Sequence, residues 1–415
     1  MKDFRKRLLT SKLESALRVL PVVVVTGARQ TGKTTLVQAL DPKLPYLTLD
    51  DLGLLEQAED HPESLLANRP IALDEVQRAP RLLHALKRAV DQSRRAGDFL
   101  LTGSANLLLM GRVAESLAGR AIYLELPPFC PVEWLEEKNP LGPLERLFAE
   151  DFDHRNDWPV VRGDFPAWLI RGGFPSALDI STDADRALWF SAYAQTYLER
   201  DLRQLSEVAS LSDFQRLMRM TAQRTGRLLN QADLARDAAL SHPTAHRYLN
   251  LLEAGCLLVR LRPYASNLTS MMVKSPKILW ADSGLAAWLA GISDQRALER
   301  RQDTGYWLEQ SLFQTLQVWR AAESDRRNLY FWRDRGGNEV DFVLEEDGVL
   351  VALELKLSAQ VASSDAKGIT AFRDALKKKG MLRRSIVLHG GIESRILGDN
   401  LFALPWGWMV PNLGT

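Results

Sequence analysis

The feature that most constrains the fold is an apolar run that leads directly into a glycine-bracketed loop. Residues 22–25 are all valine, and Gly27 to Thr34 follow with the spacing G-x-x-x-x-G-K-T. A run of β-branched residues favours a strand buried on both faces, as the strands of parallel sheets are. The apolar spacing over residues 33–40 predicts a helix directly after the loop. A strand, a glycine-rich loop and a helix in this order predict a phosphate-binding loop, or P-loop.

The residues of this loop suit a nucleoside triphosphate and its divalent cation. Gly27 and Gly32 let the backbone curl, so that its N–H groups point at phosphate oxygens. Lys33 would reach the β and γ phosphates, and the Thr34 hydroxyl would ligate Mg²⁺. We therefore expect ATP and Mg²⁺ as cofactors. The residues predicted to bind the nucleotide are Gly27, Ala28, Arg29, Gln30, Thr31, Gly32, Lys33, Thr34 and Thr35.

Two later apolar strands end in polar residues that would complete such a site. The first ends in Asp74, which would hold the Mg²⁺ shell, and is followed by Glu75, which would polarise the attacking water. The second ends in Thr102, and either Thr102 or Ser104 would sense the γ phosphate. A solvated strand end is the alternative for the Asp-Glu pair, but its position soon after a P-loop favours the catalytic interpretation.

Arg120 is a candidate for a role in a neighbouring subunit. It follows Leu117-Ala118-Gly119 and directly precedes an apolar strand. In AAA+ ATPases this place is taken by an arginine finger, which is supplied to the nucleotide of the next subunit in a homo-oligomer. The alternative is a surface arginine that caps the carboxyl end of a helix. Both interpretations remain open from the sequence.

Between residues 22 and 126 apolar strands alternate with amphipathic helices. This alternation predicts an α/β domain whose parallel sheet is covered on both faces. A stretch rich in Trp, Pro and Gly follows, and we interpret it as the lid and connection of that domain. The expected domains are a P-loop domain with its lid over 1–180, a helical and winged-helix-like domain over 181–290, and a C-terminal α/β domain over 291–415. The expected strands of the first sheet are residues 22–26, 46–49, 71–73, 99–102 and 121–126.

The middle of the chain resembles a helix-turn-helix with a wing. Residues 230–235 begin one helix, and residues 245–253 form a second one after a turn. A strand over 257–261 and the basic segment Lys274-Ser275-Pro276-Lys277 would form the wing. Winged helices also serve as protein-contact modules, so DNA is one of two partner classes. The outward side chains of the second helix, which could meet a DNA major groove, are Thr244, His246, Arg247 and Asn250.

Carboxylates in the C-terminal region follow the order of a nuclease-like site. In two adjacent strands, Asp341 and Glu354 would project from the same end and share Mg²⁺ or Mn²⁺. Lys356 lies two residues beyond Glu354 and so on the same face, where it would orient the attacking water. With Glu309 from a preceding helix, the arrangement is similar to the PD-(D/E)xK nuclease motif, although Val340 stands where the motif has Pro. The alternative is a hairpin with solvated carboxylates, and cleavage itself is left open.

The composition narrows the range of functions. Of the 415 residues, 46% are hydrophobic and 25% are charged, which is typical of globular domains. The formal net charge of +1 provides no overall field that would attract nucleic acid, so any contact with DNA must use local residues. Cys130 and Cys256 lack the spacing of a zinc site. No apolar run is long enough to span a membrane, and we expect a cytoplasmic protein without a membrane partner.

Taken together, the motifs resemble those of the prokaryotic AAA-type ATPases that carry a C-terminal DUF4143 domain. The resemblance spans nearly the whole chain and rests on Thr-Gly-Ala-Arg-Gln-Thr-Gly-Lys-Thr-Thr, Leu-Asp-Glu-Val-Gln, Leu-Leu-Thr-Gly-Ser-Ala, Leu-Ala-Gly-Arg, Gly-Gly-Phe-Pro, Pro-Lys-Ile-Leu-Trp-Ala-Asp-Ser-Gly-Leu and Glu-Val-Asp-Phe-Val. It implies an AAA-like P-loop core, a winged-helix-like middle and a restriction-endonuclease-like C-terminal domain. It places Walker A at Gly27, Gly32, Lys33 and Thr34, Walker B at Asp74 and Glu75, and the nuclease-like positions at Glu309, Asp341, Glu354 and Lys356.

These expectations favour an ATP-driven machine that acts on duplex or branched DNA. Repair or recombination intermediates and foreign DNA would all suit such a machine, with or without Mg²⁺-dependent cleavage. The alternative belongs to a different class. It is a nucleotide-switched scaffold or signalling protein whose nuclease-like domain only binds a partner.

Overall fold

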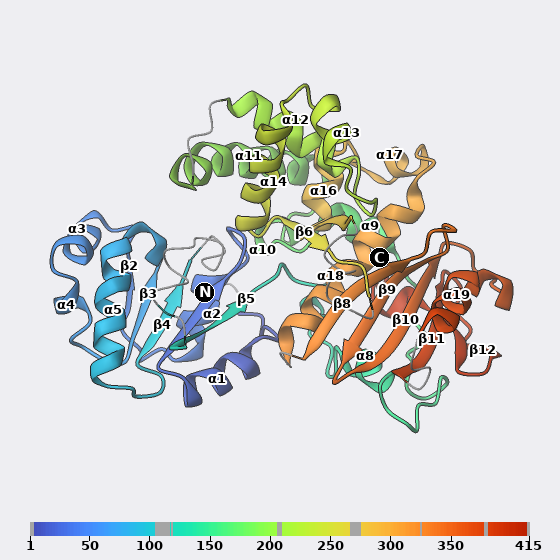
Figure 1. Ribbon diagram of the computed structural model, residues 1–415, viewed down its shortest axis with the longest axis horizontal. Helices are drawn as coiled ribbons and strands as arrows, with labels where there is room; N and C mark the ends of the chain where they lie inside the picture. Colours follow the sequence, from blue (N-terminus) through green and yellow to red (C-terminus); the bar gives the residue numbers. More distant parts are fainter. Residues whose placement is uncertain are drawn as a thin grey trace. The chain divides into compact units, whose positions relative to one another are not determined.

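The chain forms two compact units, whose course along the sequence can be followed in Figure 1. The computed structural model describes residues 4–103, 117, 119–205, 210–265, 275–323, 326–376 and 381–412, and the side chains of 197–205 are not described. The sequence motifs also include Ser104, Ala118 and Lys274, which lie outside the described residues. Unit 1 comprises Met1–Pro128, Asn250–Leu257 and Ala321–Glu323, and unit 2 comprises Phe129–Leu249, Leu258–Arg320 and Ser324–Thr415.

Unit 1 is built on a parallel sheet of five strands in the order β2-β3-β4-β1-β5. Every pairing in this sheet is parallel. The strands are β1 (Val22–Thr26), β2 (Tyr46–Thr48), β3 (Ile71–Asp74), β4 (Phe99–Thr102) and β5 (Ala121–Glu125). The predicted parallel α/β sheet is therefore confirmed, and each strand agrees with its predicted range to within one residue at either end.

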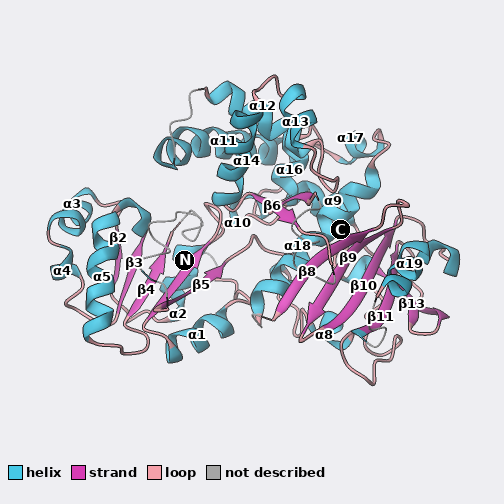
Figure 2. Cartoon of the chain, viewed as in Figure 1, coloured by secondary structure: helices cyan, strands magenta, loops and turns pink. Residues whose placement is uncertain are grey.

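Helices cover both faces of this sheet (Figure 2). They are α1 (Thr10–Val19), α2 (Lys33–Leu40), α3 (Leu52–Asp60), α4 (Pro62–Leu65) and α5 (Pro80–Gln92). Val22 and Val24 pack into a cluster that includes Leu86 of α5, whereas Val23 and Val25 pack into a second cluster with helices α1 and α2. Burial of each such side chain contributes about 1.5–3 kcal/mol. The valine run is thus explained by a central strand that buries alternate side chains on opposite faces.

The chain beyond unit 1's sheet is mainly helical up to residue 322. The helices there are α7 (Pro131–Trp134), α8 (Gly142–Arg146), α9 (Phe165–Arg171), α10 (Pro175–Leu178), α11 (Asp183–Leu205), α12 (Leu211–Ala222), α13 (Gln231–Asp237), α14 (His242–Ala254), α16 (Ser283–Leu289), α17 (Gln295–Glu299) and α18 (Thr304–Ala322). Between α14 and α16 lies a two-stranded antiparallel ribbon of β6 (Leu258–Leu261) and β7 (Lys277–Trp280). The predicted pair of short helices followed by β structure is present.

The C-terminal part of unit 2 is a mixed sheet in the order β12-β13-β11-β10-β9-β8. Strands β8 to β10 form an antiparallel meander, and β11 and β13 then run parallel to β10. Phe372 of α19 (Lys367–Ala375) packs into a cluster with Val340, and Phe313 of α18 stacks on Phe342. The expected C-terminal α/β domain is therefore a mixed sheet with helices. Its strands are β8 (Arg327–Arg333), β9 (Glu339–Glu346), β10 (Val349–Lys356), β11 (Leu382–His389), β12 (Arg395–Gly398) and β13 (Leu401–Pro405).

The stretch interpreted as a lid of the P-loop domain belongs to unit 2 from Phe129 onward. The indole N–H of Trp158 donates to the Pro405 carbonyl at 2.7 Å, and that of Trp168 donates to the Pro411 carbonyl at 2.6 Å. Buried indole N–H groups usually find an acceptor, and these two acceptors come from the C-terminal segment. These contacts group the stretch with the C-terminal sheet instead of with the P-loop sheet.

Asp282 joins two glycine-containing motifs that stand far apart in the sequence. Its carboxylate caps α16 by accepting from the Leu285 N–H at 2.7 Å, and it also accepts from the Gly173 N–H at 2.6 Å. A Cβ atom at Gly172, whose φ is +69°, would lie 2.5 Å from Asp282 Oδ1. Burial raises the pKa of Asp282 to about 6. The backbone N–H donors oppose this rise, because they stabilise the carboxylate form. The motifs therefore serve the fold of unit 2.

Asp282→Ala is expected to lower the melting temperature by about 5–10 °C, since it leaves buried N–H groups of two segments without their acceptor. The matched control is Asp294→Ala, which removes another helix cap, bonded at 2.8 Å to the Ala297 N–H at the start of α17. That change should cost about 1 kcal/mol and only a few degrees. Thermal unfolding followed by circular dichroism measures both, and equal shifts would contradict the linking role of Asp282.

The described part of the chain has no helix that combines the length and the apolar character needed to cross a bilayer. Cys130 and Cys256 are both buried.

Candidate functional site

The P-loop has the backbone that its glycines predict. Gly27, directly after β1, has a φ of +145°, and Gly32, directly before α2, has a φ of +94°. A Cβ atom at Gly27 would lie 2.4 Å from the Leu126 carbonyl oxygen, so only glycine fits there. Left-handed backbone at such positions is accessible to glycine at little cost. The turn between strand and helix is therefore fixed by the residue types that the motif contains.

Lys33 folds back over this loop. Its side chain is 6% exposed, and its ammonium donates to the carbonyls of Gly27 at 2.9 Å and Ala28 at 2.8 Å. The Thr31 hydroxyl donates to the Ala28 carbonyl at 2.9 Å and closes the loop further. A buried ammonium held above a curled loop suits a polyanionic ligand such as a triphosphate.

Asp74 joins the P-loop to the neighbouring strands. The Thr34 hydroxyl, from the start of α2, donates to Asp74 Oδ2 at 2.9 Å, and the Thr102 hydroxyl donates to Asp74 Oδ1. Strand β4 lies between β1 and β3, and the carboxyl ends of parallel strands meet at one sheet edge. The structure thus brings together three residues predicted from separate motifs. Their catalytic roles stay predictions.

Glu75 lies at the turn that follows β3. Its φ of +56° is in the left-handed region, which non-glycine residues adopt at a cost of order 1–3 kcal/mol. Its carboxylate accepts a hydrogen bond from the Gln77 side-chain amide. The strained turn and this partner fix the direction of a carboxylate next to Asp74, at the place where a general base is expected.

Two residues of this site were not predicted from the sequence. The Tyr46 hydroxyl, on β2, donates to Asp74 Oδ2, and burial followed by this hydrogen bond raises the pKa of Tyr46 well above its usual value. Arg7 is buried and donates to the Thr31 carbonyl at 2.8 Å and to the Pro127 carbonyl at 2.6 Å. These hydrogen bonds connect the P-loop to the segment after β5. No local motif marks either residue, because only the folded sheet brings them to the loop.

Arg120 forms an ion pair within its own chain. Its guanidinium donates to both oxygens of Asp91 on α5, at 2.7 and 2.9 Å. This pair fits the surface interpretation of Arg120. Supply of Arg120 to a neighbouring subunit, and the homo-oligomer that it requires, stay predictions.

The four predicted nuclease-like residues converge in unit 2. Asp341 Oδ2 accepts from the Leu355 N–H at 2.7 Å, which ties the ends of β9 and β10, and Lys356 Nζ lies 3.1 Å from Glu354 Oε1. Glu309 of α18 joins them as a buried carboxylate. Burial raises the pKa of Glu354 to about 7, the Asp341 carboxylate adds to this rise, and Lys356 opposes it.

A lysine that was expected elsewhere lies inside this cluster. Lys277 was predicted as part of a wing, and in the structure it begins β7 of the two-stranded ribbon, with a side chain that is only 1% exposed. Lys277 Nζ lies 2.8 Å from Glu309 Oε2 and 3.8 Å from Asp341 Oδ1, and it also contacts Glu339 Oε1. Burial alone would lower the pKa of Lys277, but these carboxylates outweigh burial and raise it.

The two predicted metal sites differ in how well their residues suit a cation. Thr34 and Asp74 offer a hydroxyl and a carboxylate 2.9 Å apart beside the P-loop, which suits Mg²⁺ bound to nucleotide phosphates. At the second site, Lys277 supplies a positive charge beside Asp341, and Lys356 supplies one beside Glu354. Within the residues that the structure describes, no three or more His, Cys, Asp or Glu side chains form a group that could hold a metal ion. A metal bound by Asp341 and Glu354 stays a prediction.

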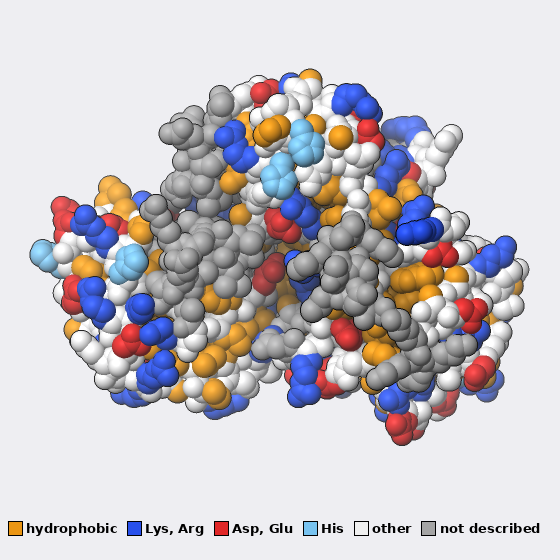
Figure 3. All heavy atoms as spheres, in the orientation of Figure 1, with side chains coloured by type: hydrophobic (Ala, Val, Ile, Leu, Met, Phe, Trp, Pro, Cys, Tyr) orange, Lys and Arg blue, Asp and Glu red, His pale blue; other side chains and the backbone are white. Residues whose placement is uncertain are grey.

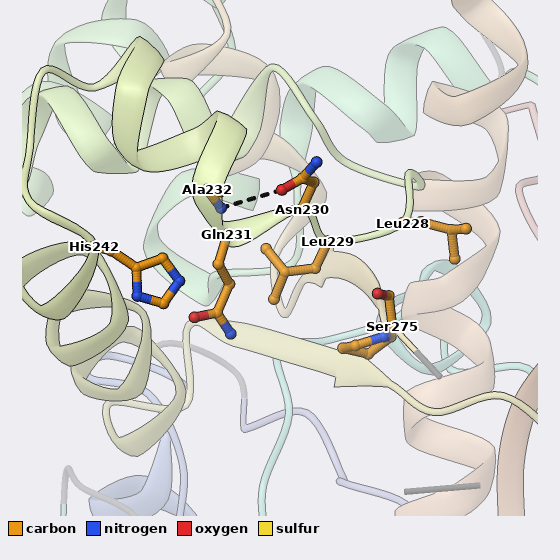
Figure 4. A pocket seen from close by; sticks show the side chains of 8 residues that line it. Leu228, Leu229, Asn230, Gln231, Ala232, His242 and Ser275 are labelled. Atoms are coloured by element: carbon orange, nitrogen blue, oxygen red, sulfur yellow. Dashed lines mark hydrogen bonds between the residues drawn. The ribbon is translucent and has the colours of Figure 1, made fainter. Parts of the chain in front are cut away.

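The region predicted to form a helix-turn-helix presents polar side chains to solvent. His246, Arg247 and Asn250 of α14 are exposed, and Thr244 is half-buried. A pocket of about 550 Å³ opens between the starts of α13 and α14, and Figure 4 shows Gln231 and His242 beside it. The residues lining it are Leu228, Leu229, Asn230, Gln231, Ala232, His242, Ser275 and Pro276.

Charge on the visible face of the molecule is mixed. In Figure 3, the described Lys and Arg side chains are interspersed with Asp and Glu. This distribution agrees with the formal net charge of +1. On this face, recognition of a polyanion such as DNA would then depend on a few local side chains.

Three family descriptions match consecutive parts of the chain. Residues 20–135 match an AAA domain, residues 162–296 match a domain of unknown function (DUF8612), and residues 304–409 match a domain of unknown function (DUF4143). The first match contains the P-loop and Asp74. The third contains Glu309, Asp341, Glu354 and Lys356, whereas Lys277 lies in the second.

Two curated relatives match almost the whole chain. The uncharacterized protein Rv2008c of Mycobacterium tuberculosis is 32% identical over 405 residues, which cover 96% of this chain and 83% of that protein. The uncharacterized protein Mb2031c of Mycobacterium bovis gives the same values.

Among solved structures, the Walker-type ATPase PABY2304 of Pyrococcus abyssi is similar at 18% identity and a TM-score of 0.39, covering 69% of this chain and 99% of that chain. A RuvB variant of Thermotoga maritima is similar at 20% identity and a TM-score of 0.28, covering 61% and 88%.

Proposed function

Because this chain belongs to the family of P-loop ATPases that join an AAA domain to a C-terminal DUF4143 domain, we propose that it hydrolyses ATP with Mg²⁺ and uses the hydrolysis to act on DNA. The observation that carries the ATPase part is the hydrogen-bonded group around Asp74. There the P-loop residue Thr34 and the sensor candidate Thr102 meet one carboxylate.

Each residue of this group has a chemical role in the proposal. Lys33 and the loop N–H groups bind the phosphates of ATP, and Thr34 and Asp74 hold the cation. Mg²⁺, when bound, neutralises charge on the phosphate oxygens. Glu75 orients and polarises the water that attacks the γ phosphate, because its carboxylate lies next to Asp74 on a rigid turn.

The DNA part of the proposal is supported by the second helix of the helix-turn-helix region. Its exposed His246, Arg247 and Asn250 offer donors and acceptors that suit base edges and phosphates. The pocket next to Gln231 and His242 provides further polar groups at the start of the same helix. Because overall charge is balanced, we expect a modest affinity that depends on these side chains.

We expect a particular DNA, whether duplex, single-stranded or branched, to raise the ATP hydrolysis rate. Arg247→Ala should lower the affinity for that DNA several-fold. It should also reduce the slope of log affinity against log salt by about 1, as the loss of a phosphate contact does. A coupled ATPase assay over a DNA titration at several salt concentrations measures both. The control is Arg88→Ala, which removes an exposed arginine paired with Glu63 in unit 1 and should leave the DNA response unchanged.

A second candidate function is a nucleotide-switched scaffold whose C-terminal domain only binds a partner. The observation that favours it is Lys277, a buried cation paired with Glu309 and 3.8 Å from Asp341, one of the two carboxylates predicted to hold a nuclease metal. The same assay separates the two candidates. A hydrolysis rate indifferent to every DNA tested would contradict the action on DNA and favour the scaffold.

A further inference from the structure

The nuclease-like cluster of unit 2 already contains a cation. Lys277 Nζ lies 2.8 Å from Glu309 Oε2, contacts Glu339 Oε1 and lies 3.8 Å from Asp341 Oδ1. An ammonium has three N–H donors, and here it faces three carboxylates from α18 and β9. A buried charge persists only where such partners compensate its lost hydration. The side chain is therefore an integral part of the cluster.

The backbone that carries Lys277 is held on both sides. Lys277 pairs with Leu261 of β6 and forms an isolated bridge with Leu228. Next to it, the Leu229 N–H donates to the Pro276 carbonyl at 2.8 Å, and the Ile278 N–H donates to the Arg227 carbonyl at 3.0 Å. The ammonium also lies 5.6 Å from the centre of the Phe331 ring, within cation–π range. These contacts fix the place of the ammonium.

Few carboxylate oxygens of the cluster remain available as metal ligands. Mg²⁺ requires near-octahedral oxygen ligands at 2.0–2.1 Å. Asp341 is engaged on both oxygens, by Lys277 and by the Leu355 N–H, and Glu354 Oε1 is paired with Lys356. Glu354 Oε2 is buried and has no hydrogen-bond partner, but a single oxygen does not make a metal site. Of the two carboxylates that a nuclease metal would bridge, Asp341 already faces the ammonium of Lys277, and Glu354 is paired with Lys356.

We infer that Lys277 is a resident cation that takes the place of the divalent metal in this cluster. The C-terminal domain then holds no catalytic metal and cleaves no phosphodiester. Its ion cluster instead fastens the β6–β7 ribbon, which follows the helix-turn-helix, to the sheet of β8 to β10. The inference is independent of ATP hydrolysis, which uses residues of unit 1.

The test is an electron paramagnetic resonance titration of Mn²⁺ into the nucleotide-free full chain, with thermal unfolding in parallel. We expect the unchanged protein and its Asp341→Asn variant to bind the same amount of Mn²⁺, because the cluster holds no metal in either. Lys277→Met should lower the melting temperature by about 10 °C, because it leaves buried carboxylates without their counter-charge. The same variant should gain one tight Mn²⁺ per chain, recover part of the lost melting temperature when Mn²⁺ is added, and lose both effects when Asp341→Asn is added.

Two further variants keep the test decisive. Lys277→Arg retains the charge and should bind no Mn²⁺. This result can be measured even if Lys277→Met fails to fold. Lys356→Met removes the other ammonium of the cluster and should also gain no Mn²⁺. An Mn²⁺ site in the unchanged protein that depends on Asp341 would overturn the inference. So would a folded Lys277→Met chain that gains no metal, or a gain in Lys356→Met equal to that in Lys277→Met.

Discussion

Lys33→Ala is expected to lower the rate of ATP hydrolysis by at least about 100-fold, the effect seen when a preorganised donor to developing charge is lost. Lys33 is held over the P-loop by the carbonyls of Gly27 and Ala28, so it is positioned before ATP arrives. Its removal deprives the β and γ phosphates of their main positive partner. Steady-state phosphate release measures the rate.

The matched control for this change is Lys43→Ala, which removes an exposed lysine shortly after α2 and should leave turnover unchanged. Unfolding temperatures of both variants check that the fold persists. Normal turnover in a folded Lys33→Ala chain would contradict the assignment of the P-loop.

Glu75→Gln is expected to separate binding from chemistry. Loss of a general base lowers turnover by about 100- to 10,000-fold, whereas the amide keeps the size of the side chain. The P-loop, Thr34 and Asp74 remain in place, so ATP affinity should change little. Single-turnover hydrolysis and equilibrium binding of a fluorescent ATP analogue measure the two quantities.

Glu63→Gln is the control for this second change, since Glu63 is an exposed carboxylate on α4 paired with Arg88. It should alter neither quantity. If Glu75→Gln weakened binding and turnover equally, Glu75 would be part of the nucleotide's binding site and not the base.

The P-loop could be predicted to the residue because its causes are local. The valines of β1 favour a buried strand, Gly27 and Gly32 supply the left-handed turn, and α2 begins at Lys33 and ends at Leu40 as expected. Thr102 could be placed near Asp74 for a similar reason, because strand ends in a parallel sheet share an edge.

Lys277 could not be placed in this way. It stands in a basic segment with Lys274, from which the sequence predicted part of a wing and gave no sign of burial. The carboxylates that surround it come from α18 and β9, more than 30 residues away, and only the fold of unit 2 brings them together. The D…ExK spacing predicted which carboxylates converge but carried no information about the cation between them.

Tyr46 and Arg7 illustrate the same limit in unit 1. Tyr46 reaches Asp74 because β2 pairs with β3, and Arg7 reaches Thr31 because α1 packs under the sheet. Neither neighbour follows from sequence spacing. Residues that support a motif from other elements are therefore the part of such a site that the sequence does not reveal.

The proposed function requires that unit 1 binds ATP with Mg²⁺ through its P-loop. Isothermal titration calorimetry of the full chain with a non-hydrolysable ATP analogue tests it most directly, with Mg²⁺ present or chelated and with Lys33→Ala as the comparison. We expect one nucleotide per chain, bound more tightly with Mg²⁺ and lost in Lys33→Ala. Absence of binding in the presence of Mg²⁺, or binding that Lys33→Ala leaves unchanged, would contradict it.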